Sequence, residues 1–557
     1  MKMKSIKAKI FFGFVFVVLV FSSAFADEKT EKVDKLFSSW DKTSSPGAAL
    51  AIIKEGKILY ERGYGIADLE HNVILTPASV FDIGSCSKQF TAACVALLSQ
   101  EGKISLDDDI RKYVPEVPFY RKPITVRHLV HHTSGIRDYI ELLSLAGYTV
   151  EGDCPTIEET IEMLARQKNL NFLPGQEWLY SNSGYFLLSL IVERASGKSL
   201  NDFAQEKIFR PLGMTNTHFH DDHTLIVKNR AVGYSPTKDG FRIDMSSWEH
   251  TGDGALLTTV EDLALWDQAF YDSKLGKEII EQLQIPGTLN SGKKLNYAFG
   301  LMVGEYKGLK TVGHGGSWAG YRAGMIRFPE QKFSVICLSN LSTINPSSLC
   351  WKIADIYLAD KLKEEPGKEP KKEVTPLKLS KEELEEKTGN YQDKKTGTWT
   401  AVEVKEEKLK VNISGQEFLL SSVSQTRFQA LETSFDLILD FAKEEKGKPK
   451  QAILTMREEV ISLVKAPQLL PLSLAQLGEY LGEYQSAELG VTYIVLIKEG
   501  KLFLKYRNSP KDSLKAMAPD KFTLQRMNFD FFRNKKKKIG GFKLSVGRAA
   551  NIEFIKK

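Results

Sequence analysis

Ser85 and Lys88 are the residues whose types and spacing most directly suggest covalent chemistry. They lie in the stretch FDIGSCSKQFTAACVALLSQEGKI, where a turn of small residues precedes an apolar helix. Residues three apart share one face of a helix, and backbone N–H groups at a helix N-terminus stabilise an oxyanion. If Lys88 is buried, the ammonium form is penalised, so its amine can take the serine proton near neutral pH. Ser85 is then a nucleophile; the alternative is a helix-capping serine beside a solvent-facing lysine.

The spacing is weak evidence by itself, because serine and lysine often recur three residues apart. Ser291 and Lys294 have the same spacing, but they lie in a polar loop with no apolar helix behind it. The helix that follows Ser85 therefore favours Ser85, and further segments must support the choice.

A second polar turn, with Tyr180 and Asn182, occurs in FLPGQEWLYSNSGYFLLSLIVERASGKSL. It precedes an apolar helix that we expect over 184–193. A tyrosine near Lys88 can share its proton transfer, because a neighbouring ammonium lowers the tyrosine pKa. The amide of Asn182 can orient a substrate carbonyl or Lys88. This segment indicates a polar site that is completed by distant parts of the chain.

The third segment is GHGGSWAGY, in which His314, Gly316 and Ser317 begin or edge a predicted strand. Glycine lets the backbone come close to a ligand. The N–H group of Ser317 can then serve as the second oxyanion donor, opposite that of Ser85. We therefore expect His314, Gly316 and Ser317 to bind substrate.

The order Ser-x-x-Lys, Tyr-x-Asn, His-x-Gly resembles the serine β-lactamase and penicillin-binding-protein superfamily. The Tyr-Ser-Asn box is similar to that of the class C branch, as are the stretches PITVRHLVHHTSGI, IFRPLGMTNTHF and GDGALLTTVEDLALW, and the resemblance covers roughly residues 40–345. It implies that Ser85 is the acylated nucleophile and that Lys88 and Tyr180 handle its proton. It also implies that Asn182 contacts the substrate.

His314 departs from the pattern of members that act on β-lactams or peptidyl-D-alanine, which usually carry lysine there. A histidine is mostly neutral at pH 7, so it is a poor anchor for a substrate carboxylate. The His-x-Gly box resembles that of D-aminopeptidases and esterases of the superfamily. We expect a serine hydrolase that cleaves an amide or ester through acyl-Ser85, of the D-aminopeptidase or related peptidase kind. The alternatives are a carboxylesterase and a non-catalytic envelope-binding or penicillin-sensing protein.

The elements that must position these residues indicate an α/β domain over 27–359. GAALAIIKEGKILYERGYGIADLE reads as two strands around the turn at 54–57, and more strands follow near 310–340. Neighbouring strands joined by short turns predict an antiparallel sheet, with helices between the two strand groups. The fold is thus expected to be a β-lactamase-like catalytic domain. Residues 360–376 are charged and contain three prolines, which is typical of a linker.

An internal repeat follows the linker. GNYQ and VEVKEEKL recur as GEYQ and VLIKEGKL, both displaced by 93 residues. Short alternating strands predict that each copy is a small antiparallel β-barrel or sandwich. The expected domains are 377–468 and 469–557, and a D-aminopeptidase of the family also carries a pair of β-barrels.

The N-terminus combines four lysines, an apolar run and Ala24-Phe25-Ala26, which predicts a signal peptide over 1–26. We therefore expect an exported protein, periplasmic or extracellular, with no integral membrane segment after cleavage.

Removal of residues 1–26 leaves 72 basic and 70 acidic side chains, so no nucleic-acid partner is indicated. The basic run at 533–538 is interpreted as a solvated turn. The expected partner is a small-molecule or peptide substrate, and no oligomeric state is indicated.

No cofactor or metal is expected. His128 and His132 have the spacing of a helical zinc pair, but no glutamate stands between them, so structural histidines are favoured for these two and His131. Five cysteines leave at least one unpaired, and buried thiols are the favoured interpretation.

Overall fold

The computed structural model describes residues 28–363 and 377–557, the latter with gaps at 395–396, 414–415, 431–432, 434–436, 443–449, 457–458, 468–471 and 507–511. The described residues form two compact units. The first consists of 28–139, 148–165 and 172–363, and the second of 140–147, 166–171 and the described part of 377–557. The predicted signal peptide and most of the predicted linker lie outside the described residues. Among the described residues, no helix has both the length and the apolar character needed to cross a membrane.

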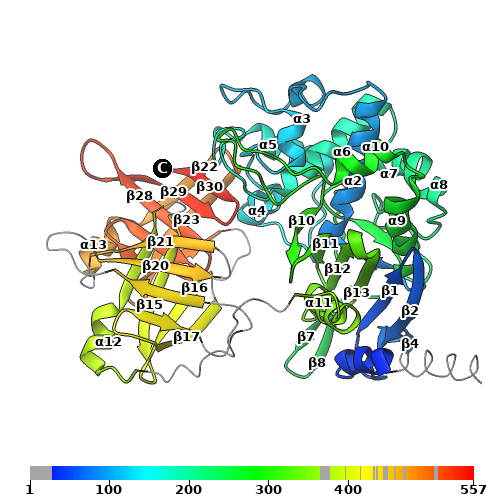
Figure 1. Ribbon diagram of the computed structural model, residues 1–557. Coiled ribbons are helices and arrows are strands. Elements are labelled where there is room, and N and C mark those ends of the chain that lie inside the picture. The colour runs from blue at the N-terminus through cyan, green and yellow to red at the C-terminus, as the bar shows by residue number, and fades with distance from the viewer. Residues whose placement is uncertain are drawn as a thin grey trace, which may run out of the picture. The chain divides into compact units, whose positions relative to one another are not determined.

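A six-stranded antiparallel sheet, in the order β10-β11-β12-β13-β1-β2, is the framework of the first unit (Figure 1). Its strands are β1 (Ala48–Lys54), β2 (Lys57–Tyr64), β10 (Met302–Tyr306), β11 (Leu309–Trp318), β12 (Tyr321–Phe328) and β13 (Phe333–Ser339). The hairpin of β1 and β2 turns at Glu55 and Gly56, which both have positive φ. The predicted antiparallel sheet, built from the first and last parts of the domain, is confirmed.

The two faces of this sheet are covered by different helices, because successive side chains of a strand point to opposite faces. Val335 of β13 belongs to the apolar core beneath α11 (Pro346–Tyr357). The preceding residue, Ser334, points to the other face and donates a hydrogen bond to Asp267 of α9 (Val260–Asp272) at 2.8 Å. Asp267 also accepts from Arg327 of β12 at 2.6 Å, a buried ion pair that ties α9 to the sheet.

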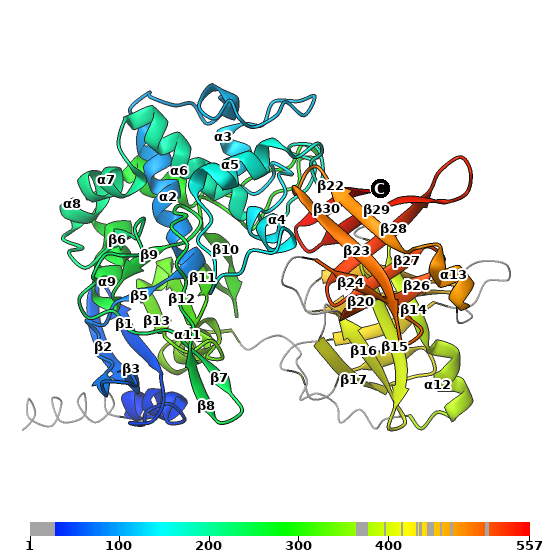
Figure 2. The same ribbon diagram turned by 180° about the vertical axis from the view of Figure 1, so that it is seen from behind.

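The remaining helices of the first unit lie mainly between β2 and β10 in the sequence. Figure 2 shows α2 and α6 side by side, and the contacts of α2 with α6 and α10 agree with that view. The helices in this part of the chain are α2 (Lys88–Gln100), α3 (Val126–Val130), α5 (Ile157–Ala165), α6 (Asn182–Ser196), α7 (Leu200–Ala204), α8 (Arg210–Leu212) and α10 (Lys277–Leu283). The helix α4 (Tyr139–Leu145) begins at Tyr139, the last residue of the first segment of this unit. Short strands form smaller sheets: β3 (Ile66–Asp68), β4 (Val73–Ile74), β5 (Phe81–Asp82), β6 (His218–Phe219), β7 (Tyr234–Thr237), β8 (Gly240–Ile243) and β9 (Leu256–Thr258).

The second unit contains the predicted duplication. Its first copy is a closed antiparallel barrel of β14 (Gly389–Asp393), β15 (Trp399–Lys405), β16 (Lys408–Ile413), β17 (Gln416–Ser422), β18 (Arg427–Gln429), β19 (Leu437–Phe441), β20 (Gln451–Met456) and β21 (Glu459–Lys465). Its second copy is a nine-stranded, nearly closed sheet of β22 (Gly482–Ser486), β23 (Val491–Lys498), β24 (Lys501–Lys505), β25 (Asp512–Ser513), β26 (Lys515–Ala518), β27 (Lys521–Leu524), β28 (Met527–Arg533), β29 (Ile539–Val546) and β30 (Ala549–Lys556). The predicted small β domains are confirmed.

Matching local contacts in the two copies support an origin by duplication. The helices α12 (Lys381–Lys387) and α13 (Leu474–Gly478) both begin with a capping box, formed by Ser380 with Glu383 and by Ser473 with Gln476. These pairs are displaced by 93 residues, the displacement found in the sequence. Each box satisfies two backbone N–H groups at its helix N-terminus, so it fixes where the helix starts.

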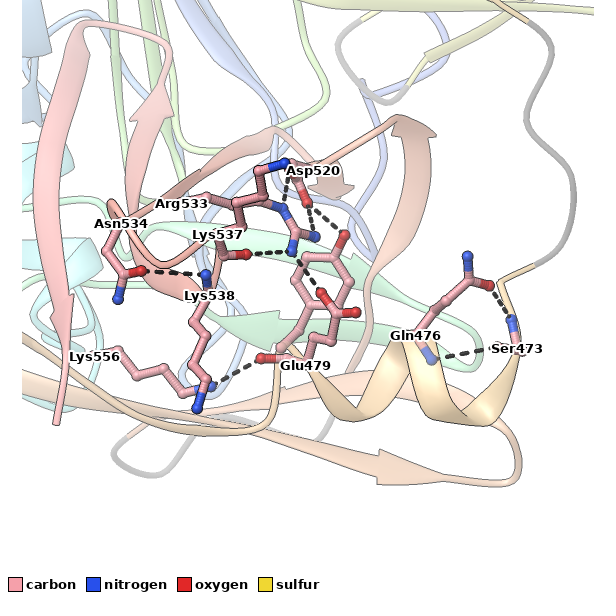
Figure 3. A network of polar contacts seen from close by, with 10 residues as sticks. Ser473, Gln476, Glu479, Asp520, Arg533, Asn534, Lys537, Lys538 and Lys556 are labelled. Carbon is pink, nitrogen blue, oxygen red and sulfur yellow. Dashed lines mark hydrogen bonds and ion pairs between the residues drawn. The ribbon is translucent and has the colours of Figure 1, made fainter.

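The basic run of the second copy lies in an exposed turn between β28 and β29 (Figure 3). Arg533 donates to Asp520 at 2.8 Å and to Glu479 at 2.6 Å, so its charge is paired. Asn534 accepts a hydrogen bond from the backbone N–H group of Lys538, which closes the turn. The run is a solvated hairpin turn, as the sequence indicated.

Candidate active site

Ser85 lies in a short 3₁₀ helix, Gly84–Ser87, which leads directly into α2. The N-cap residues of these two helices are Ile83 and Ser87, and neither side chain makes a capping hydrogen bond. Ser85 is therefore not a helix cap, and the capping alternative is wrong. Its hydroxyl oxygen accepts a hydrogen bond from Lys88 Nζ at 3.2 Å.

Lys88 is fully buried and joins three parts of the chain. Besides Ser85, its ammonium donates to the side-chain oxygen of Asn182 at 2.9 Å and to the backbone carbonyl of Asp253 at 2.5 Å. The predicted Ser-x-x-Lys and Tyr-x-Asn boxes thus meet at one nitrogen atom. These acceptors are a hydroxyl, a side-chain amide and a backbone carbonyl, and together they hold the amine in place.

The Tyr180–Asn182 segment lies at the beginning of α6. This helix starts at Asn182, two residues earlier than predicted, because the Asn182 N–H group donates to the carboxylate of Asp138 at 2.7 Å. The ring centroid of Tyr180 lies 4.9 Å from Lys88 Nζ. Tyr180, Lys88 and Ser85 therefore lie together, as the residue types suggested.

His314 and Gly316 lie in the second half of β11, inside the strand instead of at its start. Gly315, between them, faces Ser347 of α11, so His314 and Gly316 face the opposite side, toward the 3₁₀ helix. His314 Nε2 lies 3.3 Å from the hydroxyl of Tyr297. Burial and the Lys88 ammonium lower the pKa of His314 to about 4, so its imidazole is neutral at pH 7.

The 3₁₀ helix and β11 approach so closely that only glycine fits at two positions. A methyl group on Gly316 would lie 1.9 Å from the carbonyl oxygen of Ile83, and one on Gly84 would lie 2.7 Å from the nitrogen of Ser317. Gly84 also has a positive φ of 48°. These contacts place the backbone around Ser85 beside the Ser317 N–H group, on the exposed edge of the site.

Asp253 and Tyr297 are residues of the site that the sequence analysis missed. Burial raises the pKa of the Asp253 carboxyl to about 7, although the Lys88 ammonium opposes the shift. That carboxyl accepts from the Tyr139 hydroxyl at 3.2 Å, which fixes the loop whose carbonyl holds Lys88. Asp253 lies in the family-like stretch GDGALL, which was the available signal; Tyr297 had none, because it stands outside every recognised motif.

The second Ser-x-x-Lys match and the three neighbouring histidines were the other candidates for a functional site. Ser291 and Lys294 are exposed in a turn, so the second Ser-x-x-Lys match has no buried amine. His128 is part of the capping box that begins α3, and His131 packs edge-on against Phe299. His132 accepts a hydrogen bond from the N–H group of Ser181 at 3.2 Å. The three histidines make structural contacts, which the sequence analysis favoured.

The fold and the three boxes agree with a comparison against known families. The beta-lactamase family model matches residues 33–352, more than half of the chain. The chain therefore belongs to the beta-lactamase family, and it is a serine hydrolase of that family. The predicted resemblance is confirmed.

Two groups of relatives match the chain over different shares of its length. Penicillin-binding protein 4* of Bacillus subtilis strain 168 is 29% identical over 467 residues, which are 77% of this chain and 99% of that protein. A D-aminopeptidase of Brucella anthropi is 32% identical over 317 residues, 56% of this chain and 59% of that enzyme. Among solved structures, the octameric penicillin-binding protein homologue from Pyrococcus abyssi has a TM-score of 0.54 and 26% identity, covering 80% of this chain and 99% of that one.

Proposed function

We propose that this protein is an exported D-aminopeptidase-type amide hydrolase that acts through an acyl-Ser85 intermediate. The single observation that carries the proposal is the fully buried Lys88, whose Nζ atom lies 3.2 Å from Ser85 Oγ. A buried amine beside the serine hydroxyl is suited to take its proton, because burial disfavours the charged form of the amine.

In the first step, Lys88 is the neutral amine, the form that burial favours. It accepts the hydroxyl proton, with Tyr180 as its partner, while Ser85 Oγ attacks the substrate carbonyl. The N–H groups of Ser85 and Ser317 stabilise the oxyanion of the tetrahedral intermediate. Collapse of that intermediate breaks the carbon–nitrogen bond, and the accepted proton passes to the leaving amine. Water then attacks the ester of Ser85, and one of its protons passes through Lys88 and Tyr180 to Ser85 Oγ as the acid leaves.

The neutral imidazole of His314 supports an amide substrate that has no free carboxylate near the scissile bond. A neutral imidazole gives no permanent positive charge to hold such a group. Asn182 is proposed to contact the substrate carbonyl side, and Gly316 to let the substrate approach the β11 backbone. The D-aminopeptidase match supports this class of substrate.

Export is supported by the predicted signal peptide at 1–26, which favours the periplasm or the extracellular space.

The match to penicillin-binding protein 4* favours a second candidate, a penicillin-sensing protein that acylates but turns over slowly. A substrate panel on the purified protein separates the candidates: a D-amino-acid amide, a short acyl ester, a chromogenic cephalosporin and a peptide ending in D-Ala-D-Ala. We expect the highest kcat/KM for the D-amino-acid amide. Preference for the ester would identify a carboxylesterase, and stoichiometric cephalosporin labelling without turnover of any substrate would identify a sensor.

A further inference from the structure

Cys154, His223 and Glu249 lie close together in the first unit, outside the site around Ser85. Their metal-binding atoms all lie within 4.8 Å of one another. They come from three loops, after α4, after β6 and before β9, and are separated in the sequence by 69 and 26 residues. The fold therefore assembles a thiol, an imidazole and a carboxylate at one place.

The three side chains are already partly oriented toward one another. His223 Nδ1 lies 2.7 Å from Glu249 Oε1, and the His223 backbone N–H group donates to the same oxygen at 3.2 Å. The Cys154 thiol donates to the carbonyl of Ser247, two residues before Glu249, at 2.9 Å. Each link holds one of the three loops against another.

We propose that Cys154, His223 and Glu249 bind a Zn²⁺ ion. Zinc takes sulfur, nitrogen and carboxylate ligands, whereas Ca²⁺ and Mg²⁺ prefer oxygen ligands alone. Zinc bonds of about 2.0 to 2.3 Å place tetrahedral ligand atoms about 3.3 to 3.6 Å apart. The observed spacings lie on both sides of that range, from 2.7 Å between His223 Nδ1 and Glu249 Oε1 to at most 4.8 Å, so rotations of these partly exposed side chains can reach it.

The charges of the proposed ligands balance that of the Zn²⁺ ion. On binding, the thiol of Cys154 releases its proton to solvent and forms a sulfur–zinc bond, while His223 binds as the neutral imidazole. The thiolate and the Glu249 carboxylate then neutralise the two charges of the ion. Three protein ligands leave the fourth tetrahedral position to a water molecule.

The ion would fasten a loop that reaches the edge of the Ser85 site. Trp248, next to Glu249, packs against Trp318 with ring centroids 5.6 Å apart, and Trp318 follows Ser317. His250, on the other side of Glu249, bonds Thr160 Oγ1 at 2.7 Å. The same loop ends near Asp253, whose carbonyl accepts from Lys88. Zinc therefore acts here as a clamp on the loop that supports the site.

Zinc titration of the untagged full chain, stripped of metal by a chelator, tests the proposal. We expect about one Zn²⁺ per chain in competition with a chromophoric chelator, and a rise in melting temperature on binding. Co²⁺ in place of zinc should give a thiolate-to-cobalt absorption band. Cys154→Ser, His223→Ala and Glu249→Gln should each weaken binding by more than about 100-fold, because each removes a ligand.

His71→Ala is the matched control. His71 pairs with Asp68 through Nδ1 at 2.8 Å, but no cysteine joins that pair among the metal-competent groups of the described residues. This variant should bind zinc like the parent chain. The proposal is overturned if the parent chain binds no zinc at micromolar concentration, or if Cys154→Ser and His223→Ala bind it as tightly as the parent chain.

Discussion

The Nζ atom of Lys88 lies 3.2 Å from the Oγ atom of Ser85, on a side chain that is completely buried. Two further acceptors, on Asn182 and Asp253, hold the same nitrogen, so the amine cannot move away from the serine without breaking other hydrogen bonds. This geometry makes Lys88 the group whose loss should be most damaging after that of Ser85.

Replacing Lys88 with methionine should lower kcat/KM on a D-amino-acid amide by about 10²- to 10⁴-fold, the usual contribution of a positioned proton acceptor. Lys294→Met is the matched control, because Lys294 has the same spacing from a serine but is exposed. Steady-state kinetics of the two variants decide the matter. A Lys88→Met enzyme with unchanged kcat/KM would remove Lys88 from the mechanism.

Gly316→Ala should reduce both activity and stability, because its methyl group would lie 1.9 Å from the Ile83 carbonyl oxygen. Such overpacking typically costs about 1–3 kcal/mol in the free energy of unfolding, and here it would push the 3₁₀ helix away from β11. Gly478→Ala, where no atom lies within 4 Å of the added group, is the control. Chemical denaturation and kcat/KM of both variants test this; equal behaviour would contradict the tight contact.

His314 should contribute to a loss of stability in mild acid. Its pKa is about 4 in the folded chain against an ordinary value of 6.5, because burial disfavours the imidazolium. The unfolded chain therefore takes up the proton first, so stability is complete above pH 6.5 and is lost as the pH falls toward 4. His314→Gln should show a smaller drop in melting temperature between pH 7 and pH 5, although buried His131 and His250 keep their own contributions. An identical drop would exclude His314 as a source.

His314→Lys should shift specificity toward substrates with a free carboxylate near the scissile bond. A charge-assisted hydrogen bond is worth about 1.5–3 kcal/mol, so the ratio of kcat/KM between a matched carboxylate and carboxamide should change by about 10- to 100-fold. Kinetics of both proteins on that pair measure the ratio. If the ratio stays constant, His314 packs the strand and does not set specificity.

The fold was predictable from the sequence where patterns are local. The hairpin around Glu55 and Gly56 combines a turn signal with flanking apolar strands, and the 93-residue repeat identified two similar β domains. Ser85, Lys88, Tyr180 and Asn182 were found because side-chain types recur at fixed short spacing. Their meeting at one buried nitrogen could only be seen in the fold.

The missed contacts share a physical reason, which is that a motif names a residue type and not the contact that the fold gives to that residue. Asp253 holds Lys88 through a backbone carbonyl, and any residue type supplies that group. Tyr297 contacts His314 only because the loop before β10 folds toward β11. Cys154 and His223 are 69 residues apart, so no short sequence spacing predicts that the fold brings them together.

Mass spectrometry of the covalent intermediate tests the central claim most directly. The full chain is treated with a serine-directed phosphonate, digested, and its labelled peptide is sequenced, alongside Ser85→Ala and the control variants Ser291→Ala and Ser317→Ala. We predict one adduct, on Ser85, which is absent from Ser85→Ala and still present in both controls. Undiminished labelling of Ser85→Ala, or an adduct on another serine of the parent chain, would contradict the assignment of Ser85 as the nucleophile.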